Sequence, residues 1–300
     1  DAKRGKMFIL VDDKNRENEG DLIIPGSKCN SKNINFMAMH GRGLICLALT
    51  KKQIEKLSLP LMSSVNKSRM QTAFTVSIEA KSGITTGISA YDRAKTIKVA
   101  INSKVKKKDI VSPGHVFPLV ARNGGVLERA GHTEASIDIS RLAKLNPSAV
   151  ICEVMNENGR MARLDDLFKF SKKHKLKIAS IEDLISYRLK NEKLVLNTNK
   201  KVLKTKKYGN FDLRTFKNKL DNFEHYSITR GKFKGSKPVR VRVVSINIIN
   251  NKINFNNQIL KNSLKYLSKF TNFVLIIIKS QNFALTKSNK DKYTNTLRYY

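Results

Sequence analysis

Apolar and polar positions follow two kinds of spacing along the chain, and this spacing predicts the helices and strands of its first 190 residues. Short apolar runs bounded by turn residues predict buried strands, while apolar positions three and four apart predict helices. Strands are expected at residues 7–11, 22–24, 44–49, 73–78, 113–120, 149–155 and 177–181. Helices are expected at residues 33–40, 51–57, 90–102, 132–142, 164–173 and 181–190. This alternation predicts an α/β (α+β) fold, in which helices flank a mixed sheet.

The pattern weakens beyond residue 190. Residues 191–204 are polar and basic and are expected to form a linker. A strand is expected at residues 239–249 and an amphipathic helix at residues 258–270, which together predict a smaller, partial α+β domain over residues 205–300. No apolar run approaches the 18 residues that suggest a membrane span, so no membrane partner is expected.

Positive charge is concentrated in the second part of the chain. The 300 residues carry 58 Lys and Arg against 24 Asp and Glu, a net charge of +34, and residues 191–300 hold 19 of that surplus. Such charge is typical of proteins that bind anionic partners, nucleic acid among them. The alternative is a coding bias, because Lys is mixed with Asn and Ile in residues 247–252. We favour the bias, since no nucleic-acid-binding motif occurs.

The cysteines exclude two kinds of site. Cys29, Cys46 and Cys152 are odd in number, widely spaced and free of any Cys-x-x-Cys motif. This usage argues against a disulfide framework and against a structural zinc site. The sequence therefore predicts a protein of a reduced, cytoplasmic compartment.

Candidate chemistry begins directly after the first predicted strand. Residues 12–21 hold five carboxylates, and strand ends are where layered α/β folds build their sites. Five acids so close together repel one another unless a cation or a buried role holds them, and hard divalent cations such as Mg²⁺ take oxygen ligands. The run indicates a metal or acid–base site, with a solvated acidic turn as the alternative.

Two histidines and a glutamate are further candidates. His132 starts a predicted helix within residues 129–133, where an arginine and free backbone N–H groups suit a phosphate. His115 lies in a glycine-flanked loop, and either histidine could instead be structural. Glu153 interrupts an apolar strand, so it is a proton-transfer group if buried and an ordinary surface residue if the strand turns it outward. The remaining histidines are expected to be structural: His40, His174 and His225.

A set of motifs extends over residues 5–190 almost without gaps. It comprises residues 11–13, 16–21, 40–46, 74–76, 83–89, 92–93, 113–119, 124–127 and 131–135. Together they resemble the 3,4-dihydroxy-2-butanone 4-phosphate synthase family. The resemblance implies conversion of ribulose 5-phosphate to 3,4-dihydroxy-2-butanone 4-phosphate and formate with Mg²⁺ or Mn²⁺, through enolisation, dehydration, skeletal rearrangement and loss of one carbon.

The same resemblance implies roles for single residues. Glu17 and His132 would hold the metal ion. Catalytic positions are implied for His115, Glu153, Asp12 and Cys46. Substrate-binding positions are implied for Arg16, Glu17, Glu19, Asp21, Thr86, Arg129, Ala130, Gly131, His132, Thr133 and Glu153. The family is homodimeric with sites near the subunit interface, so a homodimer is expected, and Lys67 departs from a Thr that is common in the family.

The second half is similar to the GTP cyclohydrolase II part of bifunctional riboflavin proteins. Residues 208–211, 218–222 and 224–225 match the opening of that domain. The resemblance then decays: Asn247 stands where the family has its first zinc-binding cysteine, and no cysteine follows Cys152. Residues 279–284 and 297–300 further suggest a degenerate and truncated domain, with no zinc and no GTP cyclohydrolase II activity.

Overall fold

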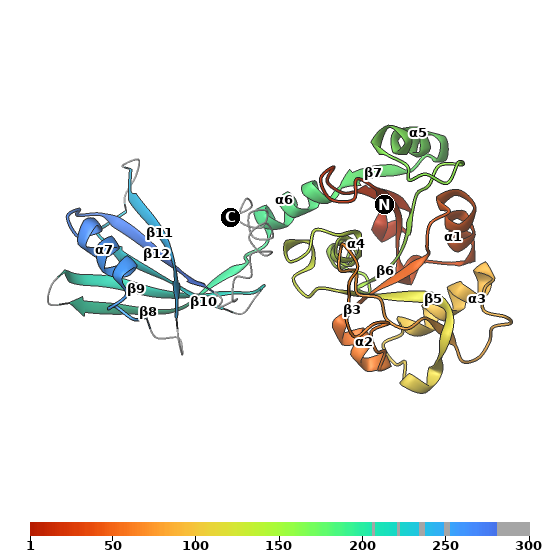
Figure 1. The fold of residues 1–300 in the computed structure, drawn as a ribbon, viewed down its shortest axis with the longest axis horizontal. Coiled ribbons are helices and arrows are strands. Elements are labelled where there is room, and N and C mark those ends of the chain that lie inside the picture. The colour runs from red at the N-terminus through yellow and green to blue at the C-terminus, as the bar shows by residue number, and fades with distance from the viewer. Residues whose placement is uncertain (206–207, 221–222, 234–237, 249–252, 281–300) are drawn as a thin grey trace. The chain divides into compact units, whose positions relative to one another are not determined.

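A mixed sheet of seven strands forms the centre of the first of two units, residues 1–192 (Figure 1). The computed structural model describes residues 1–300 except 206–207, 221–222, 234–237, 249–252 and 281–300. The strand order is β4-β5-β3-β6-β2-β1-β7, with β1 parallel to β7, β3 parallel to β5, and the other neighbours antiparallel. The strands are β1 Phe8–Val11, β2 Gly20–Pro25, β3 Cys46–Thr50, β4 Ile78–Ala80, β5 Ile110–Ala121, β6 Ser148–Glu153 and β7 Lys177–Ser180.

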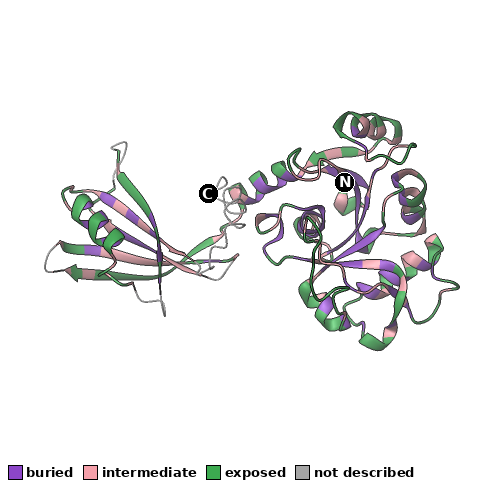
Figure 2. Cartoon of the chain, viewed as in Figure 1, coloured by how far each residue is buried: buried purple, intermediate pink, exposed green. Residues whose placement is uncertain are grey.

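Helices cover both faces of this sheet, which explains why its central strands are mostly apolar. In β2, Leu22 and Ile24 pack into the core beneath α1, α2, α3 and α5, whereas Ile23 packs into the core beneath α4 and α6. Figure 2 shows the buried residues following the strands. The helices are α1 Ser31–Phe36, α2 Lys51–Leu57, α3 Ala90–Ala100, α4 His132–Leu142, α5 Leu164–His174 and α6 Ile181–Asn191. The expected fold class is confirmed.

The second unit, residues 193–300, is a five-stranded sheet with one helix in its described part. Leu260, Leu264 and Leu267 of the helix pack on one face of the sheet, whose order is β11-β12-β10-β9-β8. The amphipathic spacing of these leucines predicted the helix. The elements are β8 Val195–Thr205, β9 Gly209–Asn218, β10 Glu224–Arg230, β11 Arg240–Asn247, α7 Gln258–Leu267 and β12 Phe273–Ser280.

Two expectations from the sequence are wrong. Residues 195–205, expected within a linker, form the edge strand β8, which pairs with β9 over its length. Most of its side chains are exposed, so no apolar alternation marks it as a strand. The strand expected at residues 73–78 is reduced to bridges at Phe74 and Thr75 before the short β4.

Among the described residues, no helix is both long enough and apolar enough to cross a bilayer. Several positions used in comparing the second unit with GTP cyclohydrolase II lie outside the described residues, namely 221–222, 281–284 and 297–300.

Candidate active site at the acidic turn

The acidic turn after β1 is folded around the carboxylate of Asp12. This side chain is 1% exposed and accepts the backbone N–H groups of Glu17 at 3.1 Å and Glu19 at 2.9 Å. It also accepts Nη1 of Arg16 at 2.7 Å, and the same nitrogen contacts Glu17. Backbone N–H groups and a guanidinium thus offset the repulsion among the acids. The turn is therefore held by specific hydrogen bonds to Asp12 and is not simply a solvated acidic loop.

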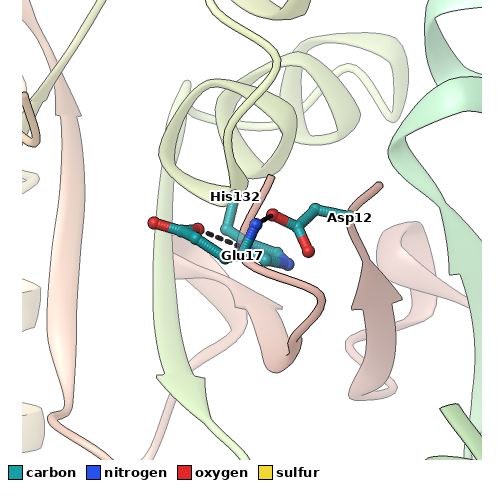
Figure 3. Close-up of side chains that lie close together, drawn as sticks. All are labelled: Asp12, Glu17 and His132. Carbon is teal, nitrogen blue, oxygen red and sulfur yellow. Dashed lines mark hydrogen bonds and ion pairs between the residues drawn. The ribbon is translucent and has the colours of Figure 1, made fainter. Parts of the chain in front are cut away.

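His132 joins the turn from the first residue of α4, where it is buried (Figure 3). Its Nε2–H donates to the carbonyl of Leu10 at 3.1 Å, because a carbonyl can only accept. Its Nδ1 lies 3.8 Å from a carboxylate oxygen of Glu17 and 3.7 Å from Oδ1 of Asp21. Oδ1 of Asp21 is buried without a hydrogen-bond partner among the described residues.

These groups fit a divalent cation. Ligand atoms of Asp12, Glu17 and His132 lie within 4.8 Å of one another. Asp12 already accepts three hydrogen bonds, so Glu17 and Nδ1 of His132 are the better ligands, with the unpartnered oxygen of Asp21 beside them. A carboxylate and an imidazole suit Mg²⁺ or Mn²⁺ with water completing the coordination.

Burial and nearby charges shift the pKa values of Asp21, His132 and Glu17. Burial raises the pKa of Asp21 to about 7, although the neighbouring His132 opposes the shift. Burial alone would lower the pKa of His132, but the charge of Asp21 and the nearby carboxylate of Glu17 raise it to about 9. Burial would raise the pKa of Glu17, but His132 and Arg16 lower it to about 2. The raised pKa of His132 therefore favours a protonated, positively charged ring near neutral pH when no cation is bound.

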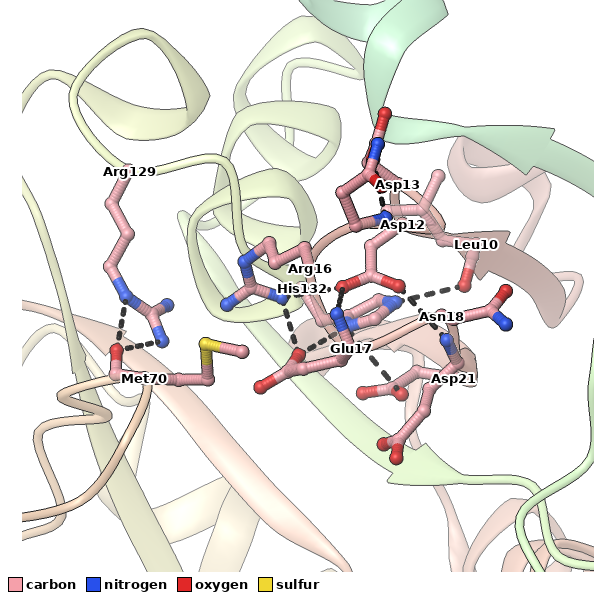
Figure 4. A network of polar contacts seen from close by, with 12 residues as sticks. Leu10, Asp12, Asp13, Arg16, Glu17, Asn18, Asp21, Met70, Arg129 and His132 are labelled. Carbon is pink, nitrogen blue, oxygen red and sulfur yellow. Dashed lines mark hydrogen bonds and ion pairs between the residues drawn. The ribbon is translucent and has the colours of Figure 1, made fainter. Parts of the chain in front are cut away.

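Two arginines flank the start of α4 (Figure 4). A Cβ added at Gly131, the N-cap residue, would meet the guanidinium groups of both Arg129 and Arg16. No side chain caps this end of the helix, so its free N–H groups and two cations converge on one place. This arrangement suits a phosphate group.

Arg129 is itself held by protein groups. Nη1 pairs with the buried carboxylate of Glu134 at 2.6 Å, while Nη2 donates to the carbonyl of Met70 at 3.1 Å and to the hydroxyl of Thr72 at 3.0 Å. Arg129 thus ties the loop before β4 to the start of α4. Lys67 lies in that loop, and the described contacts do not explain its presence there.

Glu153 ends β6 directly opposite Asp21 in β2. It is half-buried, and Oε2 accepts the backbone N–H of Leu44 at 2.9 Å. The side chain is therefore neither in the core nor simply solvated. Cys46, two residues beyond Leu44, is buried; burial and the charges of Glu153 and Asp21 raise its pKa far above neutral, so the thiol is uncharged. All three cysteines are free.

His115 lies on β5 at the same end of the sheet as Glu153. Phe117, two residues after His115, pairs with Cys46 on β3. Ile151, two residues before Glu153, pairs with the same Cys46 from the other side of β3. Nδ1 of His115 contacts Glu79.

The other predicted site residues surround this sheet end. Thr86 is exposed in the loop before α3, and Ala130 is exposed beside Gly131. Thr133 is buried in the first turn of α4, and Glu19 lies 3.9 Å from Arg163.

The remaining histidines make packing contacts. His40 and His174 lie with ring centroids 4.7 Å apart, and His174 also packs against Phe36 and Phe170. Nδ1 of His225 accepts the N–H of Lys279 at 3.2 Å. These contacts fit the structural roles expected from the sequence.

Sequence reasoning gave no role to three carboxylates that contact predicted site residues or the loop that carries one. Glu79 contacts His115, and Glu134 holds Arg129. The third, Asp92, is buried and accepts the N–H groups of Thr85 and Gly87 in the loop that carries Thr86. Only Asp92 had a local signal, because it follows the N-cap Ser89 by three residues. Glu79 lies 36 residues from its partner, and no spacing rule connects the two.

Comparison with known proteins decides the family. The model of the 3,4-dihydroxy-2-butanone 4-phosphate synthase family matches residues 1–187, which hold the whole acidic turn and α4. The chain belongs to this family. A second family model, for GTP cyclohydrolase II, matches residues 197–294.

Relatives of the synthase family agree with this assignment. The riboflavin biosynthesis protein RibBA of Aquifex aeolicus is 54% identical over 247 residues, which cover 82% of this chain and 61% of the relative. The 3,4-dihydroxy-2-butanone 4-phosphate synthase of Photobacterium phosphoreum is 50% identical over 243 residues, covering 81% of this chain and 67% of that protein. The chain thus spans less than two thirds of the first relative.

Solved structures of the family are also similar. RibBX of A. baumannii, a two-domain synthase, superposes with a TM-score of 0.79 at 39% identity and covers all of this chain and 84% of that one. A synthase in complex with two magnesium ions has a TM-score of 0.60 at 39% identity, covering 63% of this chain and 94% of that one.

Proposed function

We propose that the chain converts D-ribulose 5-phosphate to 3,4-dihydroxy-2-butanone 4-phosphate and formate. The observation that carries this proposal is the convergence of Glu17, His132 and Asp21 beside two arginines at the start of α4. One end of this site suits a cation and the other suits a phosphate. A phosphorylated ketose matches both ends of this site. Its ketone and hydroxyl oxygens can bind a cation, and its phosphate lies at the other end of the molecule.

Each group of residues has a part in this reaction. Glu17 and His132 would hold Mg²⁺ or Mn²⁺, which polarises the substrate's ketone and hydroxyl oxygens when bound. Arg16, Arg129 and the N–H groups of α4 bind the phosphate. Asp21, whose pKa lies near neutrality, and Glu153 exchange protons with the substrate, as enolisation and loss of water require.

Further residues belong to the same proposed active site. Cys46 takes part as a neutral thiol beside Glu153, and Thr86 contributes from its loop. Residues 129–133 and Glu19 shape the substrate-binding site, and His115 exchanges a proton with the substrate.

Formate release from ribulose 5-phosphate tests the proposal. We expect formate and the four-carbon phosphate in equal amounts when Mg²⁺ is added, and neither in excess EDTA. Adding Mg²⁺ back should restore turnover. Full activity in the presence of the chelator would contradict the metal's role, and no formate under any metal condition would contradict the proposed reaction.

We also propose that the protein acts as a homodimer. Three large apolar side chains on segments next to site residues are exposed: Leu44, whose N–H binds Glu153, is 43% exposed, Ile88, two residues after Thr86, 54%, and Tyr91, in the first turn of α3, 69%. Exposed apolar side chains that form a patch commonly mark interfaces. Sedimentation equilibrium should give twice the chain mass, and Tyr91→Lys should shift the equilibrium toward the monomer. A monomeric wild-type chain would refute this proposal.

For the second unit we propose that GTP cyclohydrolase II activity and zinc are both absent. No cysteine follows Cys152, so residues 193–300 offer no thiolate for zinc, and an amide such as Asn247 is a poor replacement for a soft anionic ligand. Elemental analysis should find no stoichiometric zinc, and GTP should yield no formate. One equivalent of zinc, or GTP-dependent formate release, would overturn this proposal.

A further inference from the structure

A bulge in β5 brings His115 to the short strand β4. Val116 pairs with Ile78, but the next residue of β4, Glu79, pairs with Val111, so the four residues 112–115 oppose a single step of β4. Ser77, directly before β4, fixes the bulge: its hydroxyl accepts the N–H of Gly114 at 3.1 Å. Bulges beside active sites commonly re-aim a side chain. Here the re-aimed side chain is His115.

Glu79 receives that side chain. Oε1 of Glu79 contacts Nδ1 of His115, and the carboxylate is more shielded than the ring, with 16% of its side chain exposed against 44%. A carboxylate on Nδ1 favours the tautomer that carries its proton there. Nε2 is then left as the nitrogen that can take a proton, and it has no hydrogen-bond partner among the described residues.

The loop before α3 closes over this contact. A Cβ added at Gly87 would overlap the Glu79 carboxylate and crowd Nδ1 of His115, so the backbone itself covers the pair. Gly87 has a φ of 90°, a conformation that favours glycine. Its N–H donates to the buried carboxylate of Asp92 at 3.1 Å, which anchors the loop to α3. Three elements therefore converge to hold one ring.

We propose that Glu79 is a positioning residue for the synthase reaction: it holds His115 through Nδ1, so that Nε2 is the nitrogen that exchanges a proton with the substrate. A shielded carboxylate that orients a histidine in this way also stabilises the imidazolium formed when the ring takes a proton, as the buried Asp does in the Ser-His-Asp triad. This inference rests on the proposed function, and the role of His115 in proton transfer is part of that function.

The test combines turnover with the protonation pattern of the ring. In Glu79→Gln we expect kcat to fall on the order of 10²-fold while KM changes little, because the substrate's binding groups lie on other elements. Glu79→Asp keeps the charge with a shorter side chain and should recover part of the loss. Glu55→Gln, an exposed carboxylate on α2, is the matched control and should turn over like the wild type.

Nitrogen-15 NMR of the five labelled histidines gives a readout that a purely structural role would not move. The signals lost in His115→Asn identify the ring. Without substrate, we expect the Nδ1–H tautomer in the wild type and in Glu79→Asp, and a shift toward Nε2–H in Glu79→Gln.

Two results would overturn the inference. One is wild-type kcat in Glu79→Gln. The other is a loss of thermal stability in that variant while its folded fraction keeps full turnover and an unchanged tautomer. If the wild-type chain itself releases no formate, the proposed function fails, and the tautomer measurement still decides whether Glu79 orients the ring.

Discussion

The buried ring of His132 donates its Nε2–H to the carbonyl of Leu10, at 3.1 Å. Leu10 lies on β1, one residue before that strand ends and two before Asp12 opens the acidic turn. The strand that delivers the carboxylates therefore also fixes the orientation of the histidine that faces them. Histidine ligands commonly use their second nitrogen in this way, which presents the first nitrogen in a set direction.

Replacing Glu17 by Gln should remove the metal ion while keeping the shape of the turn. An amide oxygen is a weaker ligand than a carboxylate, so we expect Mn²⁺ affinity and turnover each to fall by more than about 100-fold. Electron paramagnetic resonance of Mn²⁺ measures the first quantity and formate release the second. Glu157→Gln, a strongly exposed carboxylate, serves as the control. Unchanged Mn²⁺ binding would remove Glu17 from the ligand set.

Metal affinity should rise with pH because the cation and a proton compete for His132. The neighbouring carboxylates raise the pKa of this ring to about 9, and burial raises that of Asp21 to about 7. Between these values the affinity for Mg²⁺ should increase by up to about tenfold per pH unit, with one proton released on binding. Titration calorimetry in two buffers of different ionisation enthalpy measures both. A pH-independent affinity would contradict the competition.

The same shift predicts how the metal-free protein responds to pH. A raised pKa stabilises the folded state fully below the ordinary value near 6.5, and that stability is lost as the pH rises through about 9. The unfolding free energy measured in EDTA should therefore fall over this range. His132→Gln should flatten the dependence. A metal-free protein that becomes more stable across the same range would show that the sign is wrong.

Glu134→Gln should impair phosphate binding through Arg129. The buried pair would become a buried guanidinium next to an amide, which costs roughly 3 kcal/mol of stability. Because Arg129 then loses its fixed position, we expect KM for ribulose 5-phosphate to rise about tenfold, since charge-assisted hydrogen bonds are among the stronger ones. Measurements well below the melting temperature separate the two effects. A wild-type KM in the folded variant would assign Glu134 to stability alone.

Glu153→Gln should abolish turnover with little effect on the fold. Its carboxylate accepts only the N–H of Leu44 among the described groups, and the amide oxygen of Gln can accept the same hydrogen bond. General acid–base groups contribute about 10²–10⁴-fold in rate, and a loss in that range is expected. Thermal denaturation followed by circular dichroism provides the comparison. Collapse of the fold together with an active residual fraction would favour a structural role.

Ending the chain after Glu192 should leave formate release intact. The acidic turn, α4 and both faces of the seven-stranded sheet belong to residues 1–192. The shortened protein should also lose salt-sensitive binding to heparin, because residues 191–300 hold 19 of the 34 surplus positive charges. Formate assays and salt elution from a heparin column test the two statements. Loss of both activity and dimerisation would show that the second unit supports the first.

Local pattern alone determined the elements whose residues are buried on one or both sides. The sequence predicts α2 and α4 with the bounds that the structure has, because the apolar spacing of their residues marks both ends. It also places the acidic turn at the end of a strand and His132 at the start of a helix. β8 escaped this reasoning because its side chains are mostly exposed and its pairing with β9 is made through backbone groups, which leave no trace in the pattern of side chains.

Tertiary structure alone decided which side chains meet. The sequence pointed to Glu17 and His132 separately, and the family resemblance joined them, but only the hydrogen bond from His132 on α4 to Leu10 on β1 aims Nδ1 of His132 at the turn. Glu79 meets His115 because of a bulge between two strands. Arg129 meets Met70 through a backbone carbonyl, which the identity of the residue does not reveal. Strand register and backbone direction decide such contacts, and the spacing of residues along one segment does not predict either of them.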